Sequence, residues 1–212
     1  MSLVSIPADS ITLEGDLEIP KDAKGIVIFA HGSGSSRFSP RNNFVAKVLR
    51  DAGIGTLLFD LLTEEEDRIY ENRFNIALLT QRLLAATKWV KEQNQTKNLP
   101  IGYFGASTGS TAALKAAASL KAEIKAVVSR GGRPDLAELD LTKVQSPTLL
   151  IVGGSDEVVL GLNQEAYEKI KSVKKLEIVP GATHLFEEPG TLEEVARLAA
   201  QWFKQHLAKG KT

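Results

Sequence analysis

The chain contains 212 residues, and its 26 basic and 26 acidic side chains give a formal charge of zero at pH 7. This balance excludes the broad positive surface of a nucleic-acid-binding protein. Cysteine is absent, which excludes a disulfide framework, a zinc ribbon and a cysteine nucleophile. No run of about 18 apolar residues occurs, so no membrane-spanning helix is expected. The N-terminal stretch has neither a basic leader nor an unbroken apolar run, and a cytoplasmic protein is expected.

Seven segments have the patterns of β-strands. The first, at 10–19 (SITLEGDLEI), alternates apolar and polar side chains, which predicts an antiparallel strand with one solvated face. Six short apolar runs follow, at residues 26–30, 56–59, 101–104, 126–129, 148–152 and 176–179. Most lack alternation, as in parallel strands that helices cover on both faces. The last run (LEIV) is less continuous and is expected nearer the edge of the sheet.

Segments with helical spacing separate these runs. Ser39 and Pro40 are typical of a helix start, and Gly53 of the end of that helix. Thr191 with Glu194 predicts a capping box at the start of the C-terminal helix. Strands and helices alternate without a linker or a repeat. This order predicts one α/β domain with a mostly parallel sheet and helices on both faces.

A serine follows the third apolar run, at the strand end where active sites of such sheets gather. Residues 105–109 read Gly-Ala-Ser-Thr-Gly and precede a small-residue helix. In a G-x-S-x-G pattern, the serine occupies a tight, strained strand-to-helix turn, and the glycines remove β-carbons that would collide. The alternative is a glycine-rich turn in which the serine only caps the helix. The position between a buried strand and a helix favours the first interpretation and makes Ser107 the candidate nucleophile.

A serine hydroxyl needs a base to remove its proton, and three histidines are available. His206 lies in the last turn of the C-terminal helix and is expected at the surface. His31 ends the first apolar run and opens a glycine-rich loop. His184 follows the last predicted strand, where the chain order serine, acid, histidine places the base. His184 is therefore the predicted base, and a structural histidine is the alternative.

The third residue of such a triad is a carboxylate that lies between Ser107 and His184 and follows a strand. Asp156, after the fifth apolar run, meets both conditions. Its neighbour Glu157 is an alternative, although the two valines that follow suggest that the chain turns inward just after Asp156. Asp135 also follows a strand, where it could instead cap a helix or pair with an arginine. Asp156 is the predicted acid.

The stretch His-Gly-Ser-Gly-Ser-Ser at 31–36 follows the first apolar run. This stretch is either a loose turn or an oxyanion loop, which presents a backbone N–H to the carbonyl oxygen of a substrate. An oxyanion loop follows an unusual backbone path that requires glycine. The N–H of Thr108 would be the second donor. Arg37 stands where a dinucleotide-binding fingerprint has its third glycine, and no Walker motif occurs. The sequence therefore predicts no cofactor and no metal.

Together these motifs resemble the α/β-hydrolase family, and more narrowly its dienelactone-hydrolase-like branch. The segments that carry the resemblance are HGSGSS at 31–36, GASTG at 105–109, GGSDEVV at 153–159 and PGATHLF at 180–186. The resemblance covers nearly all of residues 1–212, which are expected to form a single domain. It implies Ser107 as nucleophile, His184 as base, Asp156 as acid, and the N–H groups of Ser33 and Thr108 as oxyanion donors. Dienelactone hydrolases proper have cysteine at the position of Ser107, so their own substrate is not expected here.

Two further features bear on the substrate. Residues 130–147 are too few for a large lid, and an open site suits small soluble molecules. Several arginines are expected near the site, namely Arg37, Arg41, Arg130 and Arg133. A guanidinium group suits an anionic acyl or alcohol portion, and Arg130 lies closest to a strand end. The alternative is that these arginines pair with carboxylates of the protein, at residues 64–66 or at Asp135.

The sequence thus predicts a serine hydrolase that cleaves small carboxylic esters through an acyl-enzyme. The same residues could serve a thioesterase, an acyltransferase or a peptidase, and a binding protein without catalysis could share the fold. The expected partner is a small-molecule ester, with no nucleic acid and no membrane. Neither the oligomeric state nor the acyl length is predicted.

Overall fold

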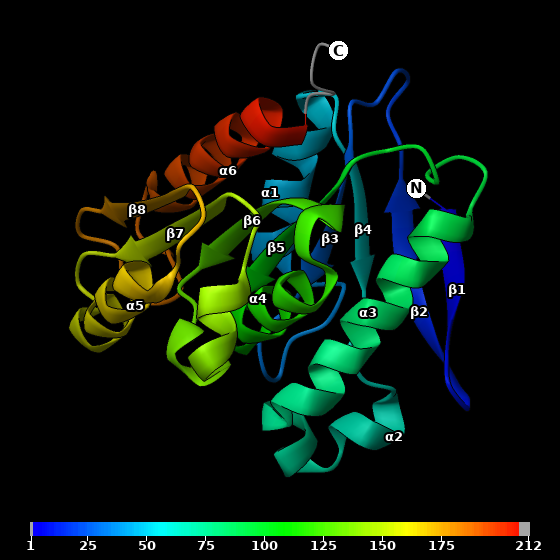
Figure 1. Ribbon diagram of the computed structural model, residues 1–212, viewed down its shortest axis with the longest axis horizontal. Coiled ribbons are helices and arrows are strands. Elements are labelled where there is room, and N and C mark those ends of the chain that lie inside the picture. The colour runs from blue at the N-terminus through cyan, green and yellow to red at the C-terminus, as the bar shows by residue number, and fades with distance from the viewer. Residues whose placement is uncertain (1, 208–212) are drawn as a thin grey trace.

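The computed structural model describes residues 2–207 and is built on one eight-stranded sheet (Figure 1). The strands are β1 (Ser2–Ala8), β2 (Ile11–Glu18), β3 (Ile26–Ala30), β4 (Gly55–Phe59), β5 (Ile101–Ala106), β6 (Ile124–Arg130), β7 (Thr148–Gly153) and β8 (Lys174–Val179). Their order is β1-β2-β4-β3-β5-β6-β7-β8. Strands β3 to β8 run parallel, whereas β2 pairs antiparallel with β1 and β4. The mostly parallel sheet is confirmed, as is the place of β8 at its edge.

Strand β1 is absent from the predicted elements. It forms the other edge of the sheet, antiparallel to β2. Ile6 and Ala8 are buried, whereas Ser5 and Pro7 are exposed. A proline has no N–H to donate to a ladder, and strands tolerate it at the edge of a sheet. The alternation is therefore short and carries a residue that argues against a strand, which explains why the pattern is weak.

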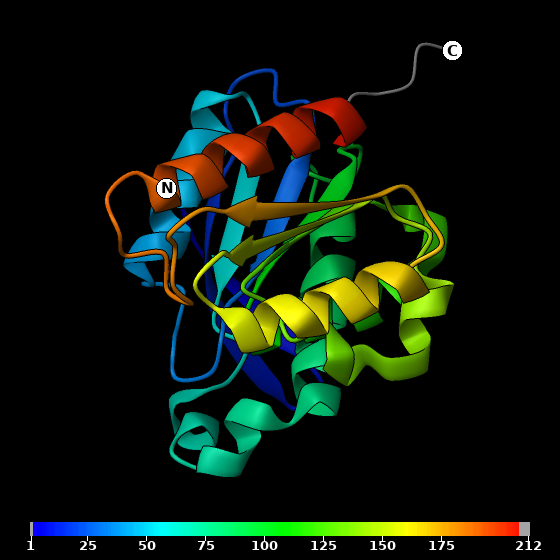
Figure 2. The same ribbon diagram turned by 90° about the vertical axis from the view of Figure 1, so that its left-hand side faces the viewer.

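Helices cover both faces of the sheet, as predicted. The helices are α1 (Pro40–Asp51), α2 (Glu64–Asp67), α3 (Ile76–Glu92), α4 (Thr108–Leu120), α5 (Glu157–Lys169) and α6 (Thr191–Leu207), with 3-10 helices η1 (Tyr70–Phe74), η2 (Lys121–Glu123) and η3 (Pro134–Lys143). Helices α1 and α6 pack on one face, and α3, α4 and α5 pack on the other. Figure 2 shows this layering at one end of the sheet, where β7 and β8 lie between α6 and α5.

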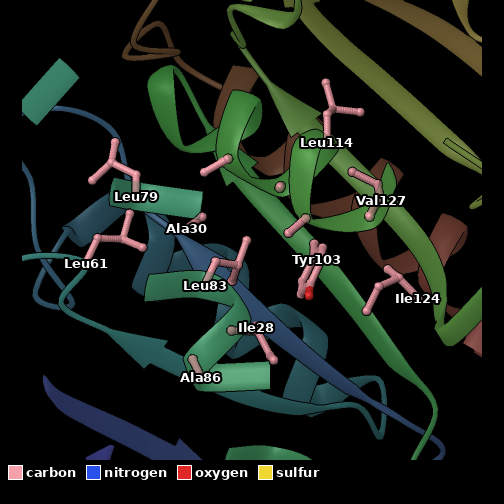
Figure 3. Packing of buried hydrophobic residues seen from close by; sticks show 14 of the residues in the cluster. Ile28, Ala30, Leu61, Leu79, Leu83, Ala86, Tyr103, Leu114, Ile124 and Val127 are labelled. Carbon is pink, nitrogen blue, oxygen red and sulfur yellow. The ribbon is translucent and has the colours of Figure 1, made fainter. Parts of the chain in front are cut away.

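The strands divide their side chains between two hydrophobic cores. Ile28 of β3 belongs to the core under α3 and α4, whereas Val27 and Phe29 belong to the core under α1 and α6. Figure 3 shows Leu83 of α3 together with Ile28 and Tyr103 in the core under α3 and α4. Because both faces of these strands are covered, the runs lack the polar alternation of a half-exposed strand.

Helix α1 begins and ends as predicted. The side chain of Ser39 accepts a hydrogen bond from the Asn42 N–H, and Pro40 is the first helical residue. Proline suits this position because its missing N–H has no partner inside the helix. Gly53 follows the helix with a φ of 78°, the left-handed conformation that glycine adopts without strain.

The capping box predicted at Thr191 and Glu194 is wrong. Helix α6 begins at Thr191 itself, and the hydroxyl of this residue donates to the Glu188 carbonyl at 2.7 Å. A capping box starts α2 instead, where Thr63 Oγ1 accepts from the Glu66 N–H and the Glu66 carboxylate accepts from the Thr63 N–H. Both segments match the same spacing, so the choice depends on where each helix enters the fold.

Two of the connections that leave the carboxyl ends of the strands contain short helical segments. Between β6 and β7, the chain forms only the 3-10 helix η3, so the described residues include no large lid there. Between β4 and α3, it forms α2 and η1, a helical excursion that the sequence does not predict and that projects beyond the sheet (Figure 1). Its Tyr70 and Phe74 rings are exposed and lie 5.2 Å apart. Within residues 2–207, no helix is both long enough and apolar enough to cross a membrane.

Candidate active site

Three of the predicted site residues follow strands that end on the same edge of the sheet. Ser107 lies between β5 and α4, Asp156 between β7 and α5, and His184 between β8 and α6. In a parallel sheet, the carboxyl ends of the strands meet at one edge, which is where ligands bind in this class of fold. The structure therefore gathers these residues although up to 77 positions separate them along the chain (184 − 107).

Ser107 occupies a backbone conformation that serine rarely adopts. Its φ is 51° and its ψ is −121°. Such a conformation costs about 1–3 kcal/mol outside glycine and persists only where the surroundings enforce it. The Ser107 N–H donates to the Arg130 carbonyl at 3.1 Å, and the Ser107 carbonyl accepts from the N–H groups of Ser110 and Arg133 at 3.0 and 3.3 Å. These hydrogen bonds hold the serine at the corner between strand and helix.

Gly105 and Gly109 are required by close approaches of the backbone. A Cβ on Gly105 would lie 2.5 Å from the Ser110 Cα, and a Cβ on Gly109 would lie 2.1 Å from the Ala30 carbonyl oxygen. Both distances are below the 3.0 Å that real Cβ atoms respect. The collisions expected from the G-x-S-x-G pattern are therefore present in the structure. Without side chains at these two positions, α4 packs directly against β5 and the end of β3.

His184 and Asp156 are in direct contact. The Nδ1 atom of His184 lies 2.7 Å from Oδ2 of Asp156, with 39% and 15% of the two side chains exposed. An ionised carboxylate accepts a hydrogen bond from Nδ1–H, which leaves Nε2 as the basic nitrogen of the neutral ring. Gly131 packs against this ring, since a Cβ there would lie 3.5 Å from Nδ1. The orientation of His184 is thus set from two sides.

The two rival carboxylates lie elsewhere. Asp135 accepts hydrogen bonds from Nε and Nη2 of Arg133 at 2.9 and 2.8 Å, which is its alternative role as an arginine partner. Glu157 is the first residue of α5, and its side chain is exposed. Of the three carboxylates weighed from the sequence, Asp156 is the one that contacts His184.

Ser107 and His184 are not joined by a hydrogen bond within residues 2–207. In sites without substrate, such bonds are often long and become short only when the substrate binds. Contact between these two side chains therefore stays a prediction. Ser107 is partly exposed, so a molecule from solvent can reach it.

His31 holds the loop that follows β3. Its Nδ1 lies 2.9 Å from the Gly32 carbonyl, and its Nε2 accepts a hydrogen bond from the Leu61 N–H at 3.0 Å. This pattern needs a neutral ring with its proton on Nδ1, and burial lowers the pKa of His31 accordingly. Beyond it, Ser33 is exposed and Gly34 has a φ of 67°. His31 is therefore an anchor for the loop.

The two predicted oxyanion donors flank Ser107. Thr108 is the first residue of α4, where a backbone N–H has no acceptor inside the helix. A Cβ on Gly32 would lie 3.1 Å from the Ser107 Cβ, so the loop that carries Ser33 abuts the serine. Within the described hydrogen bonds, the N–H groups of Ser33 and Thr108 have no acceptor. Their convergence on one substrate oxygen stays a prediction.

The four arginines expected near the site differ in their partners. Three contact carboxylates: Arg37 contacts Glu14, Asp16 and Asp60, Arg41 contacts Glu187, and Arg133 contacts Asp135. The pairing of Arg133 is the alternative weighed from the sequence, whereas the partners of Arg37 are not the glutamates at 64–66. Arg130 is buried, and within residues 2–207 its Nε and Nη1 atoms have no acceptor. Contact of Arg37, Arg130 or Arg133 with a substrate stays a prediction.

Asn163 is a positioning residue that no sequence pattern indicates. It is fully buried in α5, and its Nδ2 donates to the Gly132 carbonyl at 3.0 Å. Gly132 belongs to the segment whose flanking residues, Arg130 and Arg133, hold the backbone of Ser107. An asparagine inside a helix usually faces solvent, so composition and spacing do not distinguish this residue from a surface amide.

A cavity of about 490 Å³ adjoins the loop after β3. Its lining includes His31, Arg37, Phe38 and Thr63, and the carboxylates of Glu14, Asp60, Glu64 and Asp67. Ser107 is not among the lining residues, so this cavity does not enclose the serine. Although carboxylates are abundant here, no group of three or more metal-ligating side chains within residues 2–207 is placed to hold a metal ion.

Comparison with known proteins identifies a matching family and similar solved structures. A sequence model of the dienelactone hydrolase family matches residues 13–207 of this chain. The crystal structure of a dienelactone hydrolase from Anabaena variabilis is 54% identical, with a TM-score of 0.94 and coverage of 97% of each chain. Est1E from Butyrivibrio proteoclasticus shares the fold at 20% identity, with a TM-score of 0.85 over 99% of this chain and 100% of that one.

Curated relatives come from two strains of Mycobacterium tuberculosis. Each carries the name "Putative phosphoribosyl transferase" and is 58% identical over 204 residues, which are 96% of this chain and 46% of the relative. The chain therefore spans about half the length of these relatives. The name "Putative phosphoribosyl transferase" was given to these longer proteins as a whole.

Proposed function

The chain belongs to the dienelactone hydrolase family and is a hydrolase of the α/β type, and we propose that it cleaves small carboxylic esters with Ser107 as the nucleophile. One observation carries the proposal. The His184 Nδ1 lies 2.7 Å from the Asp156 carboxylate, at the edge where Ser107 is held in a strained strand-to-helix turn. A serine, a histidine and a carboxylate in these roles activate a hydroxyl for acyl transfer.

In the first half of the proposed reaction, Ser107 Oγ attacks the ester carbonyl carbon and His184 Nε2 takes the hydroxyl proton. Asp156 keeps the other ring proton on Nδ1 and stabilises the imidazolium. The bond from the carbonyl carbon to the alcohol oxygen then breaks, and His184 gives its proton to the departing alcohol. In the second half, water attacks the acyl group on Ser107 and passes a proton to His184. The carboxylic acid leaves, and the serine hydroxyl is restored.

Negative charge forms on the carbonyl oxygen in both halves. The proposed donors to this oxygen are the backbone N–H groups of Thr108 and Ser33. Thr108 begins α4, and the positive end of the helix dipole favours an anion at this place. Loss of one such donor typically lowers kcat by about 10²–10³. His31 supports the Ser33 side because its two hydrogen bonds fix the start of the loop.

The connections at the carboxyl edge of the sheet favour small substrates with an apolar part. The connection between β6 and β7 adds only η3, and Ser107 itself is partly exposed. Phe38, Tyr70, Phe74 and Leu185 are exposed on segments that follow the carboxyl ends of β3, β4 and β8. These side chains offer apolar surface to an acyl or alcohol group but do not enclose a long chain.

Labelling with a fluorophosphonate tests the proposal, because this probe reacts with activated serine hydroxyls and not with ordinary ones. We expect the mass of the probe on the peptide that contains Ser107, and loss of labelling in Ser107→Ala and in His184→Ala. Ser119→Ala is the matched control, because Ser119 is an exposed serine on the same helix. Equal labelling of the folded Ser107→Ala protein and the parent would contradict the assignment. A panel of 4-nitrophenyl esters then ranks acyl groups by kcat/KM.

A further inference from the structure

Strand β8 is an edge strand of the sheet, and within residues 2–207 its only neighbouring strand is β7. Figure 2 looks onto this edge, where β8 (orange) runs between α6 and α5 and no other ribbon is drawn across it. The outer side of an edge strand is a row of N–H and C=O groups without partners in the sheet, and such a row can pair with a strand of another chain. The edge of β8 is therefore a candidate interaction surface.

Alternate residues of β8 direct their backbone groups away from the sheet. The Val173 carbonyl accepts the Thr148 N–H at 2.8 Å, and the Val179 carbonyl accepts the Gly154 N–H at 2.9 Å. In a parallel pair, every second residue directs both of its backbone groups to the neighbouring strand, and the residues between them face the other way. These two hydrogen bonds therefore place the odd-numbered residues of β8 toward β7. The residues with outward N–H and C=O groups are Lys174, Leu176 and Ile178.

A second copy of β8, in antiparallel orientation, pairs all of these outward groups in one register. A two-fold axis at Leu176 sets Leu176 opposite its counterpart, and Lys174 opposite Ile178 of the second copy. In each such pair, the two residues exchange both N–H···O bonds. Because the two-fold axis uses the same edge of each copy, the assembly closes as a dimer and does not continue as a fibre.

The charges of β8 select this register. It sets Lys175 opposite Glu177 of the second copy on both sides of the axis, at positions where the side chains of facing strands lie closest. The neighbouring registers that keep outward groups opposite each other are shifted by two residues. One of them sets Lys175 opposite Lys175, and the other sets Glu177 opposite Glu177. Opposite charges across a strand pair are favourable and like charges are unfavourable, so the strand is complementary to itself in the first register only.

The two lysines of β8 do not block pairing, although lysine on an edge strand often has that effect. Lys174 is folded back toward the end of α5, where its Nζ donates to the Ile170 carbonyl at 2.9 Å and lies 4.3 Å from the centre of the Tyr167 ring. Lys175 contacts Glu177 of its own strand at 2.5 Å, and its side chain is 59% exposed. In the dimer, each Lys175 has one glutamate on its own strand and another on the facing strand.

Pairing also covers apolar surface. Ile178 is 44% exposed, and Leu176 is only partly buried against the core under α3 and α4. Side chains two positions apart lie on the same face of a strand, so Leu176 and Ile178 of both copies gather around the axis on one face. The opposite edge of the sheet differs, because β1 carries the exposed Pro7, a residue that edge strands use against further pairing.

We propose that this chain forms a homodimer in which β8 pairs antiparallel with β8 of a second copy, with the two-fold axis at Leu176. One sheet then continues through both copies. The interface uses no residue of the candidate active site, so this proposal does not depend on the proposed function.

The mass in solution is measured by sedimentation velocity, over protein concentrations from micromolar to millimolar. We expect the parent to be a dimer at the upper end of this range, with a dimer fraction that rises with concentration. Lys175→Glu sets like charges opposite each other on both sides of the axis, and so does Glu177→Lys. Each change should raise the Kd of the dimer by roughly 10-fold or more, because two attractive pairs become repulsive. Lys47→Glu reverses a lysine of an exposed pair with Asp51 on α1 and is the matched control, which should dimerise as the parent does.

Rescue separates a lost contact from a lost fold. Mixed in equal amounts, the Lys175→Glu and Glu177→Lys proteins should form a heterodimer, because two glutamates of one copy then face two lysines of the other. The double variant Lys175→Glu/Glu177→Lys should dimerise by itself, because opposite charges again face each other. Single variants that dimerise as tightly as the parent would overturn the proposal, and so would weakened single variants that neither mixing nor the double change restores.

Hydrogen exchange locates the interface. The amides of Lys174, Leu176 and Ile178 face outward, so they should exchange slowly in the dimer and rapidly in the Lys175→Glu protein at the same concentration. A parent that stays monomeric over the whole concentration range overturns the proposal. A dimer in which these three amides exchange rapidly also overturns it, because that dimer uses another surface.

Discussion

The His184 Nδ1 lies 2.7 Å from the Asp156 Oδ2, whereas Asp135, which follows the strand next to that of Ser107, is held by two hydrogen bonds from Arg133. Both aspartates follow strands on the same edge of the sheet. Their partners differ because the loop between β8 and α6 crosses over Gly131 and brings the imidazole to β7. The two aspartates are thus natural controls for each other.

Asp156→Asn should lower kcat for ester hydrolysis on the order of 10⁴-fold, because an amide stabilises the wrong ring tautomer of His184. Asp135→Asn should leave kcat nearly unchanged, because a partly exposed pair with Arg133 contributes at most about 1 kcal/mol to stability. The comparison needs kcat for both variants with one ester, and circular dichroism to show that both fold. A larger loss in Asp135→Asn than in Asp156→Asn would contradict the choice of acid.

Ser107→Ala should lower kcat by several orders of magnitude while the melting temperature stays near that of the parent. Residues of a triad act as a unit, so loss of the nucleophile removes nearly all of their joint contribution. Alanine differs by one hydroxyl and meets the same positive φ at this corner, so the fold should persist. Ester hydrolysis within about threefold of the parent would rule out Ser107 as the nucleophile.

The turn around Ser107 could be predicted because its requirement is local. The pattern places glycines where β-carbons would collide, and the structure shows these collisions at Gly105 and Gly109. The strands could be predicted for a similar reason, since burial on both faces demands unbroken apolar runs. Such features depend on neighbours in the chain or on burial alone, and both are visible in the sequence.

Partners that come from distant segments could be predicted only in part, because chain order favours Asp156 as the partner of His184 without excluding the other two carboxylates. Asp156, Glu157 and Asp135 all follow strands, and only the course of the loop that carries His184 separates them. The isolation of Arg130 depends on which side chains approach it from α1 and from the loop after β8. The capping spacing was ambiguous in the same way, because two helices carry it and only α2 uses it.

Gly109→Ala should destabilise the protein and reduce activity, because the new Cβ would lie 2.1 Å from the Ala30 carbonyl oxygen and 2.5 Å from that of His31. Overpacking of this kind costs about 1–3 kcal/mol, and backbone atoms give way less easily than side chains. Helix α4 must then move away from the loop after β3, and the Thr108 N–H moves with it.

The matched control for Gly109→Ala is Gly161→Ala in α5, where a Cβ would meet no atom of another segment of residues 2–207 within 4 Å. Alanine is favoured over glycine inside a helix by about 1 kcal/mol, so this variant should be more stable than the parent. Urea unfolding measures both changes, and kcat with one ester measures the effect on the site. Equal stability of the two variants would show that the approach of α4 to β3 is not tight.

The pH dependence of stability should depend on His31. Burial lowers the pKa of His31 below its ordinary value of 6.5, so the unfolded chain takes up a proton at a higher pH than the folded chain does. The stability that neutral His31 contributes is therefore complete above pH 6.5 and is lost as the pH falls from 6.5 through the lowered folded pKa. Protonation would also place a donor at Nε2, which accepts the Leu61 N–H at 3.0 Å.

His31→Gln keeps an acceptor for that N–H but does not titrate, so its melting temperature should fall less than that of the parent between neutral and mildly acidic pH. The pKa of His206 is also lowered by burial, but this residue is present in both proteins, so the difference between the two slopes reports His31. Identical slopes would show that His31 is not held neutral by the fold.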